Sequence, residues 1–416
     1  MELTKTTFVQ TEVGLIPIDW KVYNLGEIAF VTKLAGFEYS LHFNSYKDGG
    51  DIIVVRGTNI THNKMDLSDV KTIPSTTSKK LLRSKLFKND LVFAYVGTIG
   101  PVFLIEEDDK YHLGPNTAKI SAVKEIDPKY LFHYFTSPFI LNEIFETTSI
   151  GAQPSLSMSK IRGFNIVTPT LTEQKAIATA LSDIDSLISS LDKLISKKKA
   201  IKQGAIQELL TPPHQGGRRL PGYSGEWVEI ELKEKYTFIN GKPYENKLDS
   251  SGEYFLITLD SVNIEGNLKA NHKRVDFYDN SLIKGDLVTV LSDIAHAKLL
   301  GLSGYITENK KYVLNQRMGR LRFDSDIDPQ FARYQINYHQ EYFKNRGQGS
   351  SQRHIYKKDF DEFILKYPKK NEQQQIVEIL NDLQDEINTL ICKKSKFLDL
   401  KQGMMQELLT GKTRLI

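Results

Sequence analysis

The sequence predicts a duplicated fold, in which two globular parts alternate with two long helices that pair with each other. Three observations support this fold class: the chain repeats itself, both copies carry a heptad pattern, and a proline-rich connector separates them. At 416 residues the chain is long enough for two or three domains that each bury a core. Its 40% hydrophobic and 25% charged content is ordinary for folded protein and argues against a disordered chain.

The repeat is clearest in two segments of equal length. Residues 173–211 match residues 372–410 without a gap, and 17 of the 39 positions are identical. Weaker similarity extends upstream, where residues 126–128 and 327–329 both read Ile-Asp-Pro. The chain is therefore two copies of one unit, a diverged globular part of about 150 residues followed by a better-matched helical segment.

Both matched segments carry a heptad. Apolar residues recur at alternating steps of four and three, from Ile177 to Leu209 and from Ile376 to Leu408. Such a narrow stripe is typical of a coiled coil, and a helix of this length cannot bury it alone. We therefore expect the two helices to pair within one molecule. The alternative is that each helix packs on its own globular domain.

Four residues interrupt the stripe or the helix at matched positions. Lys202 and Lys401 occupy seam positions, where they would fix the register of the pairing. Gly204 and Gly403 lie inside the predicted helices, where a glycine costs roughly 1 kcal/mol relative to alanine. We expect another group to approach the backbone closely at both glycines.

The proline-rich connector separates the two copies. It begins at Pro212 and Pro213, which end the first helix. The expected boundaries are a first globular domain at 1–170, a first helix at 171–211, the connector at 212–226, a second globular domain at 227–370, and a second helix with the C-terminal tail at 371–416.

Charge and cysteine content limit the function classes. The net charge of +4 gives no general excess of cations, so contact with a polyanion must come from local patches. A single cysteine, Cys392, argues against a disulfide framework and a multi-cysteine zinc site. The amino-terminal residues lack an apolar signal segment, and no run of about 18 apolar residues occurs. We expect a cytoplasmic protein that does not contact membranes.

Three short motifs give the sequence a family resemblance. Gly-Ala-Gln-Pro-Ser-Leu at 151–156 leads to a Pro-x-x-x-Glu-Gln motif at 169–174, the centre reads Arg-Leu-Pro-Gly-Tyr-Ser-Gly-Glu-Trp at 219–227, and the opening reads Val-Gly-Leu-Ile-Pro-Ile-Asp-Trp at 13–20. Together with the alternating domains and helices, this order resembles the DNA specificity subunits of type I restriction-modification systems. The resemblance covers the whole chain.

The resemblance implies both a fold and a function. The globular parts would be α/β (α+β) target recognition domains, and the helices an antiparallel coiled coil between them, with an internal pseudo-twofold repeat. Each domain would read one half of a bipartite, asymmetric site in double-stranded DNA. Two methyltransferase subunits and two restriction (translocase) subunits would dock on the chain. The chain itself would be no enzyme and hold no cofactor or metal, because S-adenosylmethionine for adenine methylation would sit on the methyltransferase partner.

Candidate DNA contacts are polar or basic residues in glycine-rich loops, because cations bind phosphates and polar side chains read base edges. In the second copy, the run from Gly347 to His354 is the strongest candidate, since its glycines permit close approach. For Gln153 and Gln352, the alternative to a DNA contact is that the side chain caps the following helix or strand. For each single Lys or Arg the alternative is a solvated surface role. The candidates in the first domain are Arg56, Thr58, Asn59, Lys79, Lys80, Arg83, Tyr95, Thr98, Asn116, Gln153 and Ser155. Those in the second domain are Ser261, Lys273, Arg274, Ser292, His296, Lys298, Gln316, Arg317, Arg320, Gln348, Ser350, Gln352, Arg353 and His354.

Two other function classes remain open at this point. A coiled-coil adaptor that binds only proteins would show the same heptads. A self-contained methyltransferase or nuclease would need catalytic motifs, and the run Thr-Pro-Pro-His at 211–214 lacks both the first polar residue and the aromatic residue of an adenine methyltransferase motif.

Overall fold

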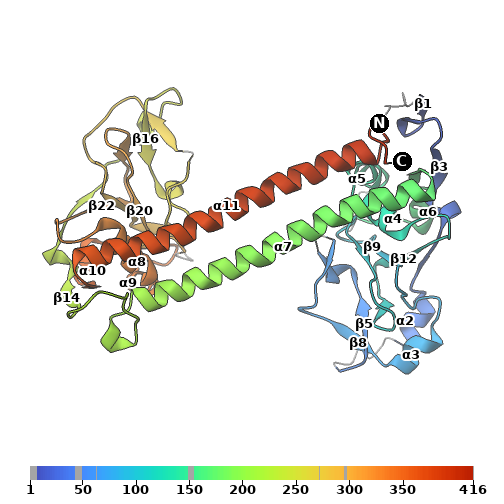
Figure 1. The fold of residues 1–416 in the computed structure, drawn as a ribbon, viewed down its shortest axis with the longest axis horizontal. Helices are drawn as coiled ribbons and strands as arrows, with labels where there is room; N and C mark the ends of the chain where they lie inside the picture. The colour runs from blue at the N-terminus through green and yellow to red at the C-terminus, as the bar shows by residue number, and fades with distance from the viewer. Residues whose placement is uncertain are drawn as a thin grey trace. The chain divides into compact units, whose positions relative to one another are not determined.

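The chain forms two compact units, and each takes one part of both long helices. The computed structural model describes residues 7–42, 49–61, 63–148, 154–270, 272–294 and 298–415. Unit 1 comprises Met1–Asp192 and Cys392–Ile416, and unit 2 comprises Lys193–Ile391. Figure 1 labels the elements of both units.

Unit 1 contains two main sheets. One is antiparallel in the order β10-β9-β12-β4, and the other has β11 parallel and β8 antiparallel to the central β5. Smaller pairs join β1 to β2, β3 to β13 and β6 to β7. The strands are β1 (Phe8–Thr11), β2 (Gly14–Pro17), β3 (Lys21–Asn24), β4 (Ala29–Lys33), β5 (Ile52–Val55), β6 (Ile60–Thr61), β7 (Lys64–Met65), β8 (Lys71–Ile73), β9 (Leu91–Ala94), β10 (Val102–Leu104), β11 (Tyr111–Leu113), β12 (Thr117–Ala122) and β13 (Asn165–Thr168).

Unit 2 repeats this topology. Its antiparallel sheet has the order β15-β22-β18-β20, and its second sheet has β21 parallel and β17 antiparallel to β16. The register is the same, since Ile120 faces Leu91 in unit 1 and Leu321 faces Leu287 in unit 2. The strands are β14 (Val228–Glu231), β15 (Tyr236–Asn240), β16 (Tyr254–Ile257), β17 (Lys273–Val275), β18 (Leu287–Val290), β19 (Ser292–Ile294), β20 (Ser303–Tyr305), β21 (Tyr312–Leu314), β22 (Met318–Phe323), β23 (Gln352–His354) and β24 (Ile364–Tyr367).

Short helices complete each unit, and the matched Ile-Asp-Pro motifs begin two of them. Asp127 and Asp328 each accept two backbone N–H groups as helix caps, with proline at the first helical position. The helices are α1 (Leu25–Ile28), α2 (Gly36–His42), α3 (Ser75–Lys80), α4 (Pro128–Phe135), α5 (Pro138–Thr147), α6 (Met158–Arg162), α8 (Pro329–Tyr338), α9 (Gln340–Arg346) and α10 (Lys357–Asp361), with 3-10 turns η1 (Gly57–Asn59), η2 (Pro213–Gln215), η3 (Leu232–Glu234), η4 (Glu245–Lys247) and η5 (Leu259–Ser261).

The matched Glu-Gln motif ties each long helix to its unit. Gln174 accepts a hydrogen bond from the Asp127 backbone N–H at 2.9 Å, and Gln373 accepts one from the Asp328 backbone N–H at 2.8 Å. Both glutamines are buried. The repeated motif therefore fixes the start of the helix against the turn that begins α4 or α8.

The long helices, α7 (Leu171–Leu209) and α11 (Lys370–Leu408), have 39 residues each and are green and red in Figure 1. In unit 1, Lys401 pairs with Asp185 at 2.7 Å. In unit 2, Lys198 pairs with Glu386 at 2.6 Å. The number on α11 falls as the number on α7 rises, so the helices are antiparallel. The predicted fold class is confirmed, and the first turns of each helix also pack in the core of the unit where it begins.

Among the described residues, the close approach expected at the two helix glycines is absent. A Cβ atom built on Gly204 or Gly403 would meet no atom within 4 Å among the described residues. Gly204 is exposed and Gly403 is half-buried, so neither glycine lies in a tightly packed contact of the described chain. Nothing within the described chain explains the cost of a glycine at these two positions.

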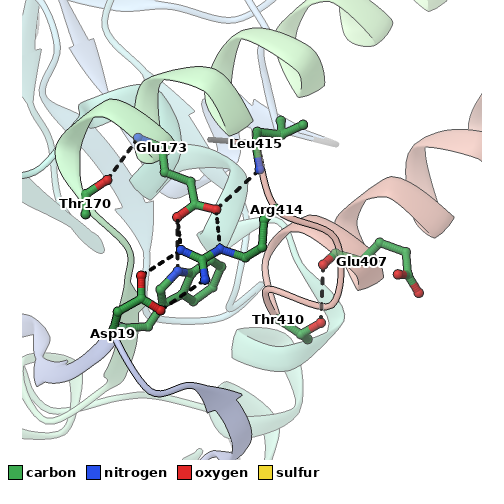
Figure 2. Close-up of polar contacts among 8 residues, drawn as sticks. Asp19, Thr170, Glu173, Glu407, Thr410, Arg414 and Leu415 are labelled. Atoms are coloured by element: carbon green, nitrogen blue, oxygen red, sulfur yellow. Dashed lines mark hydrogen bonds and ion pairs between the residues drawn. The ribbon is translucent and has the colours of Figure 1, made fainter. Parts of the chain in front are cut away.

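An arginine closes each unit around the buried glutamate of the Glu-Gln motif. Figure 2 shows the Arg414 guanidinium between the carboxylates of Asp19 and Glu173. Its nitrogens lie 2.7 Å from each carboxylate, and the Trp20 indole donates to Glu173 at 3.1 Å. These bonds raise the pKa of Arg414, first through Glu173 and then through Asp19. The C-terminal tail is thereby anchored to unit 1.

Candidate nucleic-acid interface

Three loops that sequence analysis selected meet at one end of the antiparallel sheet of unit 1. They are the turn after β9, the residues before β12 and the segment before α6. Tyr95 donates its backbone N–H to the Asn116 carbonyl at 3.1 Å, Leu156 donates to the Tyr95 carbonyl at 3.0 Å, and Gly97 donates to the Pro154 carbonyl at 3.0 Å. We call this three-loop contact the unit 1 junction.

A cavity of about 380 Å³ opens at the unit 1 junction. Its lining includes four of the predicted DNA contacts, Arg56, Thr58, Thr98 and Asn116. Thr58, Thr98 and Asn116 are exposed. Asn116 has a φ of 64°, in the left-handed region that asparagine tolerates better than most residues. The backbone thus presents a hydrogen-bonding amide at the edge of a concave surface.

The charge at this cavity is partly neutralised. The Arg56 guanidinium pairs with Asp69 at 3.0 Å and donates to the side-chain oxygen of Asn59 at 3.1 Å. Burial raises the pKa of Tyr95, so its hydroxyl stays protonated near neutral pH. No local pattern in the sequence links Asp69 to Arg56, so this ion pair is visible only in the folded unit. The cavity therefore offers polar groups more than net positive charge.

Unit 2 contains the equivalent junction. Leu291 donates its backbone N–H to the Arg317 carbonyl at 2.9 Å, and Ile355 donates to the Leu291 carbonyl at 2.9 Å. These bonds match those of Tyr95, Asn116 and Leu156 one for one. Arg317 has a φ of 66°, so it repeats the unusual backbone of Asn116 with a different side chain. The same scaffold thus carries an amide in one unit and a guanidinium in the other.

The glycine-rich run of unit 2 forms a hairpin beside that junction. Strand β23 pairs with β19, which places His354 opposite Ser292. Gln348 and His354 exchange two backbone hydrogen bonds of 2.9 and 2.8 Å across the turn. Gly349 has a φ of 110°, which explains the glycine at the turn. Gln348 and Ser350 are exposed, and Gln352 is half-buried.

Four predicted contacts are buried, and two of them bond the backbone of their own loops. Asn59 donates to the carbonyls of Asp66 and Asp69, and Ser261 accepts from the Thr258 backbone N–H at 3.0 Å. Ser292 and Arg320 are also inside unit 2, 1% and 8% exposed. A polar side chain in a tight loop can bond the local backbone as readily as a ligand, which composition does not distinguish.

The remaining predicted contacts fall into two groups: some lie next to the unit 2 junction, and others are exposed cations elsewhere in the units. The Arg353 guanidinium is turned inward, donating to the Gly347 carbonyl at 2.8 Å. Gln316 is half-buried next to Arg317. Gln153 and His296 lie outside the described residues. The exposed cations away from the junctions are Lys79 and Lys80 at the end of α3, Arg83 after it, Lys273 and Arg274 on β17, and Lys298.

In the ranges that the structure describes, no group of three or more His, Cys, Asp or Glu side chains could hold a metal ion. None of the helices described there is long and apolar enough to cross a membrane.

Comparison with known proteins identifies the family. Residues 17–203 and 224–396 match the family described as type I restriction modification DNA specificity domain. A relative assigned as the MjaX type I restriction enzyme specificity subunit of Methanocaldococcus jannaschii is 27% identical over 432 residues, covering 98% of this chain and 96% of the relative.

Solved structures have the same fold. The S subunit of a type I restriction-modification system from M. genitalium matches with a TM-score of 0.61 and 16% identity, over 94% of this chain and 96% of that chain. A chain from a study of complex assembly and conformational transition of the type I R-M system matches with a TM-score of 0.56 and 16% identity, over 96% and 99%. The chain belongs to the type I restriction-modification DNA specificity family, as a non-catalytic subunit with two target recognition domains.

Proposed function

We propose that this chain reads a bipartite, asymmetric DNA sequence, one half with each unit, and brings docked methyltransferase and restriction subunits to that site. The observation that carries the proposal is the repeated junction. Asn116 and Arg317 have the same left-handed φ and accept equivalent backbone hydrogen bonds, but their side chains differ. Equivalent scaffolds with different reading groups would select different half-sites.

The chemistry of the two side chains fits base readout. An asparagine amide makes two hydrogen bonds to adenine, and an arginine guanidinium makes two to guanine. Thr58 and Thr98 line the same cavity as Asn116, and Gln348 and Ser350 are exposed on the hairpin of unit 2, so these side chains would add short polar contacts. The exposed cations outside the junctions would bind phosphates and set the register of the protein on the duplex. Binding should therefore weaken as salt rises.

We infer that the exposed faces of the long helices dock the partner subunits. In the part of α7 that belongs to unit 2, Leu194 and Ile201 are 39% and 44% exposed and lie seven residues apart, so they form an apolar patch on one exposed face of the helix. Gly204 and Gly403 leave open space at matched positions of both helices. The matched glycines are a surface feature that both helices share, and a shared feature suits two identical partners, so we propose two methyltransferase subunits and two restriction subunits.

The catalytic chemistry would belong to those partners. S-adenosylmethionine and the methyl transfer to adenine would reside on the methyltransferase subunits, which this chain directs to their site. Methylation of chromosomal DNA takes place in the cytoplasm of a prokaryote, which is where we place the complex. The exposed free thiol of Cys392 is compatible with that reducing compartment.

A domain exchange tests the proposal. The chain is purified with its methyltransferase partner, and methylated adenines are mapped in a library of DNA sequences. Exchanging residues 20–170 for those of a related chain should change one half-site and leave the other half-site and the spacing intact. Absence of any methylation by the complex, or simultaneous change of both half-sites, would refute it. Binding to proteins alone, without salt-dependent binding to duplex DNA, would favour an adaptor instead.

A further inference from the structure

Unit 2 contains a cavity that is separate from its junction. It has a volume of about 550 Å³ and is enclosed by α8, the turn that includes Asn263, Asn267 and neighbouring residues, and the parts of α7 and α11 that belong to unit 2. This volume is within the range of small-molecule sites. Its wall combines cations, side-chain amides and an apolar floor that includes Ile206 and Ile387.

Two cations in this cavity lack a carboxylate partner among the described residues. The Lys202 ammonium donates to the side-chain oxygen of Gln384 at 2.5 Å. Arg333, only 9% exposed, donates from Nη1 to Asn267 at 3.3 Å, and its Nε has no hydrogen-bond partner within the described ranges. Lys199 adds a third positive charge to the lining.

Acidic groups near the cavity are few and exposed. Glu265 lines the cavity, and Asp385 lines the adjoining depression that Arg333 also borders. Both are exposed to solvent, and neither forms an ion pair with Lys202 or Arg333 in the described structure. The lining of the main cavity therefore carries three cations against one carboxylate.

In unit 1, the lysine at the equivalent position has a carboxylate partner. Lys401 is the repeat counterpart of Lys202, and it contacts the Asp185 carboxylate at 2.7 and 2.9 Å. Gln384 occupies in unit 2 the position of Asp185 in unit 1. Counting from the matched helix caps, Arg333 occupies the position of Phe132. At this place unit 2 therefore has an amide where unit 1 has a carboxylate, and a cation where unit 1 has an aromatic ring.

A buried cation without a counter-charge is energetically unfavourable. Burial, and then the charge of Arg333, lowers the pKa of Lys202 to about 8, and burial also lowers the pKa of Arg333. An anion entering the cavity would relieve both effects. The side-chain amide of Asn263 lines the same wall and could donate to its oxygens.

We propose that this cavity of unit 2 binds the phosphate group of a small molecule. A phosphate carries up to two negative charges and several acceptor oxygens, which suit a guanidinium, an ammonium and neighbouring amides together. The free ion and a nucleotide present the same phosphate chemistry. The volume beyond the cations leaves room for a nucleoside.

Calorimetric titration of the full chain with inorganic phosphate and with adenosine monophosphate tests the proposal, with chloride at equal ionic strength as the reference. Gln384→Asp supplies the carboxylate that unit 1 has, and Arg333→Phe supplies the residue that unit 1 has. Gln402→Asp is the matched control, because Gln402 is exposed on the same helix in unit 1.

We expect phosphate to bind the wild-type chain and to raise the melting temperature of unit 2. Gln384→Asp should raise that temperature without phosphate and weaken phosphate binding by at least about tenfold, because the new carboxylate pairs with the Lys202 ammonium in place of phosphate. Arg333→Phe should weaken binding similarly, and Gln402→Asp should change neither property. Tighter binding of the nucleotide identifies it as the ligand, and equal binding identifies the free ion.

Three outcomes would overturn the proposal. The first is a wild-type chain that phosphate and the nucleotide stabilise no more than chloride does. The second is a Gln384→Asp variant that is folded but binds phosphate as well as the wild type. The third is displacement of phosphate by duplex DNA in proportion to DNA binding, which would assign these cations to the DNA backbone.

Discussion

The two units close around the same buried glutamate with different parts of the chain. In unit 1 the arginine comes from the C-terminal tail, and Glu173 also accepts the Trp20 indole N–H. In unit 2, Arg219 comes from the connector and contacts Glu372 at 2.7 Å, while the Trp227 indole nitrogen has no partner in the described chain. Tail and connector are thus structurally equivalent. The other hydrogen-bond donors to each glutamate therefore determine how much stability each unit loses without its arginine.

The largest expected effect comes from removing these arginines. Arg414→Ala and Arg219→Ala should each cost about 3–5 kcal/mol of unfolding free energy, because each leaves a buried carboxylate unpaired. The loss should be greater for Arg219→Ala, since Trp20 still donates to Glu173 after loss of Arg414. Urea unfolding followed by tryptophan fluorescence measures this, because each unit contains one tryptophan.

Arg218→Ala is the matched control for these variants. Arg218 is exposed and lies 3.9 Å from Glu208, so its removal should change stability by less than about 0.5 kcal/mol. A loss from Arg219→Ala no larger than that of this control would show that the buried glutamate needs no counter-charge.

A pH titration should separate the units next. Burial lowers the pKa of His112 and of His133 in unit 1 to about 4. Between that value and the ordinary 6.5, the unfolded state binds protons that the folded state does not, so the stability of unit 1 falls as pH falls. The full loss is roughly 3 kcal/mol for each histidine.

Urea midpoints at about pH 7 and about pH 5 test this pH dependence. His133→Gln should flatten the dependence of unit 1. Burial also lowers the pKa of His272 and His339 in unit 2, but these two are only half-buried whereas His112 and His133 are fully buried, so the unit 2 midpoint should move less. Equal movement of both transitions would contradict the assignment.

Base recognition should respond to single changes at the junctions. Asn116→Ala and Arg317→Ala should each relax sequence preference at one half-site by about 1–3 kcal/mol, without altering the other half. Methylation rates of the assembled complex on singly altered sites measure this. Lys80→Ala is the control, since loss of a phosphate contact should weaken binding uniformly and lower its salt dependence. Identical half-site effects from both junction variants would argue against two separate readers.

The smallest effect should differ in sign between the units. Lys401→Met leaves the Asp185 carboxylate without its cation and should destabilise unit 1 by about 0.5–1 kcal/mol. Lys202→Met removes a partly buried charge that lacks a carboxylate partner, so it should be neutral or slightly stabilising. Calorimetric melting in phosphate-free buffer compares the two, and a loss of the same size in both units would mean that Gln384 compensates Lys202 fully.

Much of the architecture follows from local sequence patterns. The repeat reveals the duplication, and the heptads predict both long helices, which the structure shows at Leu171–Leu209 and Lys370–Leu408. These features are readable because helical periodicity and chain breaks are encoded in neighbouring residues. The loop candidates rest on local composition. Composition indicates Arg56, Thr98 and Asn116 one by one and does not indicate that they lie together.

Only the tertiary structure decided which of those residues share a site. Strands β9 and β12 are neighbours in the sheet, and this brings Thr98 and Asn116 to one cavity while Asn59 turns inward to bond its own loop. Lys202 and Lys401 occupy identical sequence motifs, yet one faces an amide and the other a carboxylate. The charge that a side chain meets comes from residues about 200 positions away, and no local pattern in the sequence contains it.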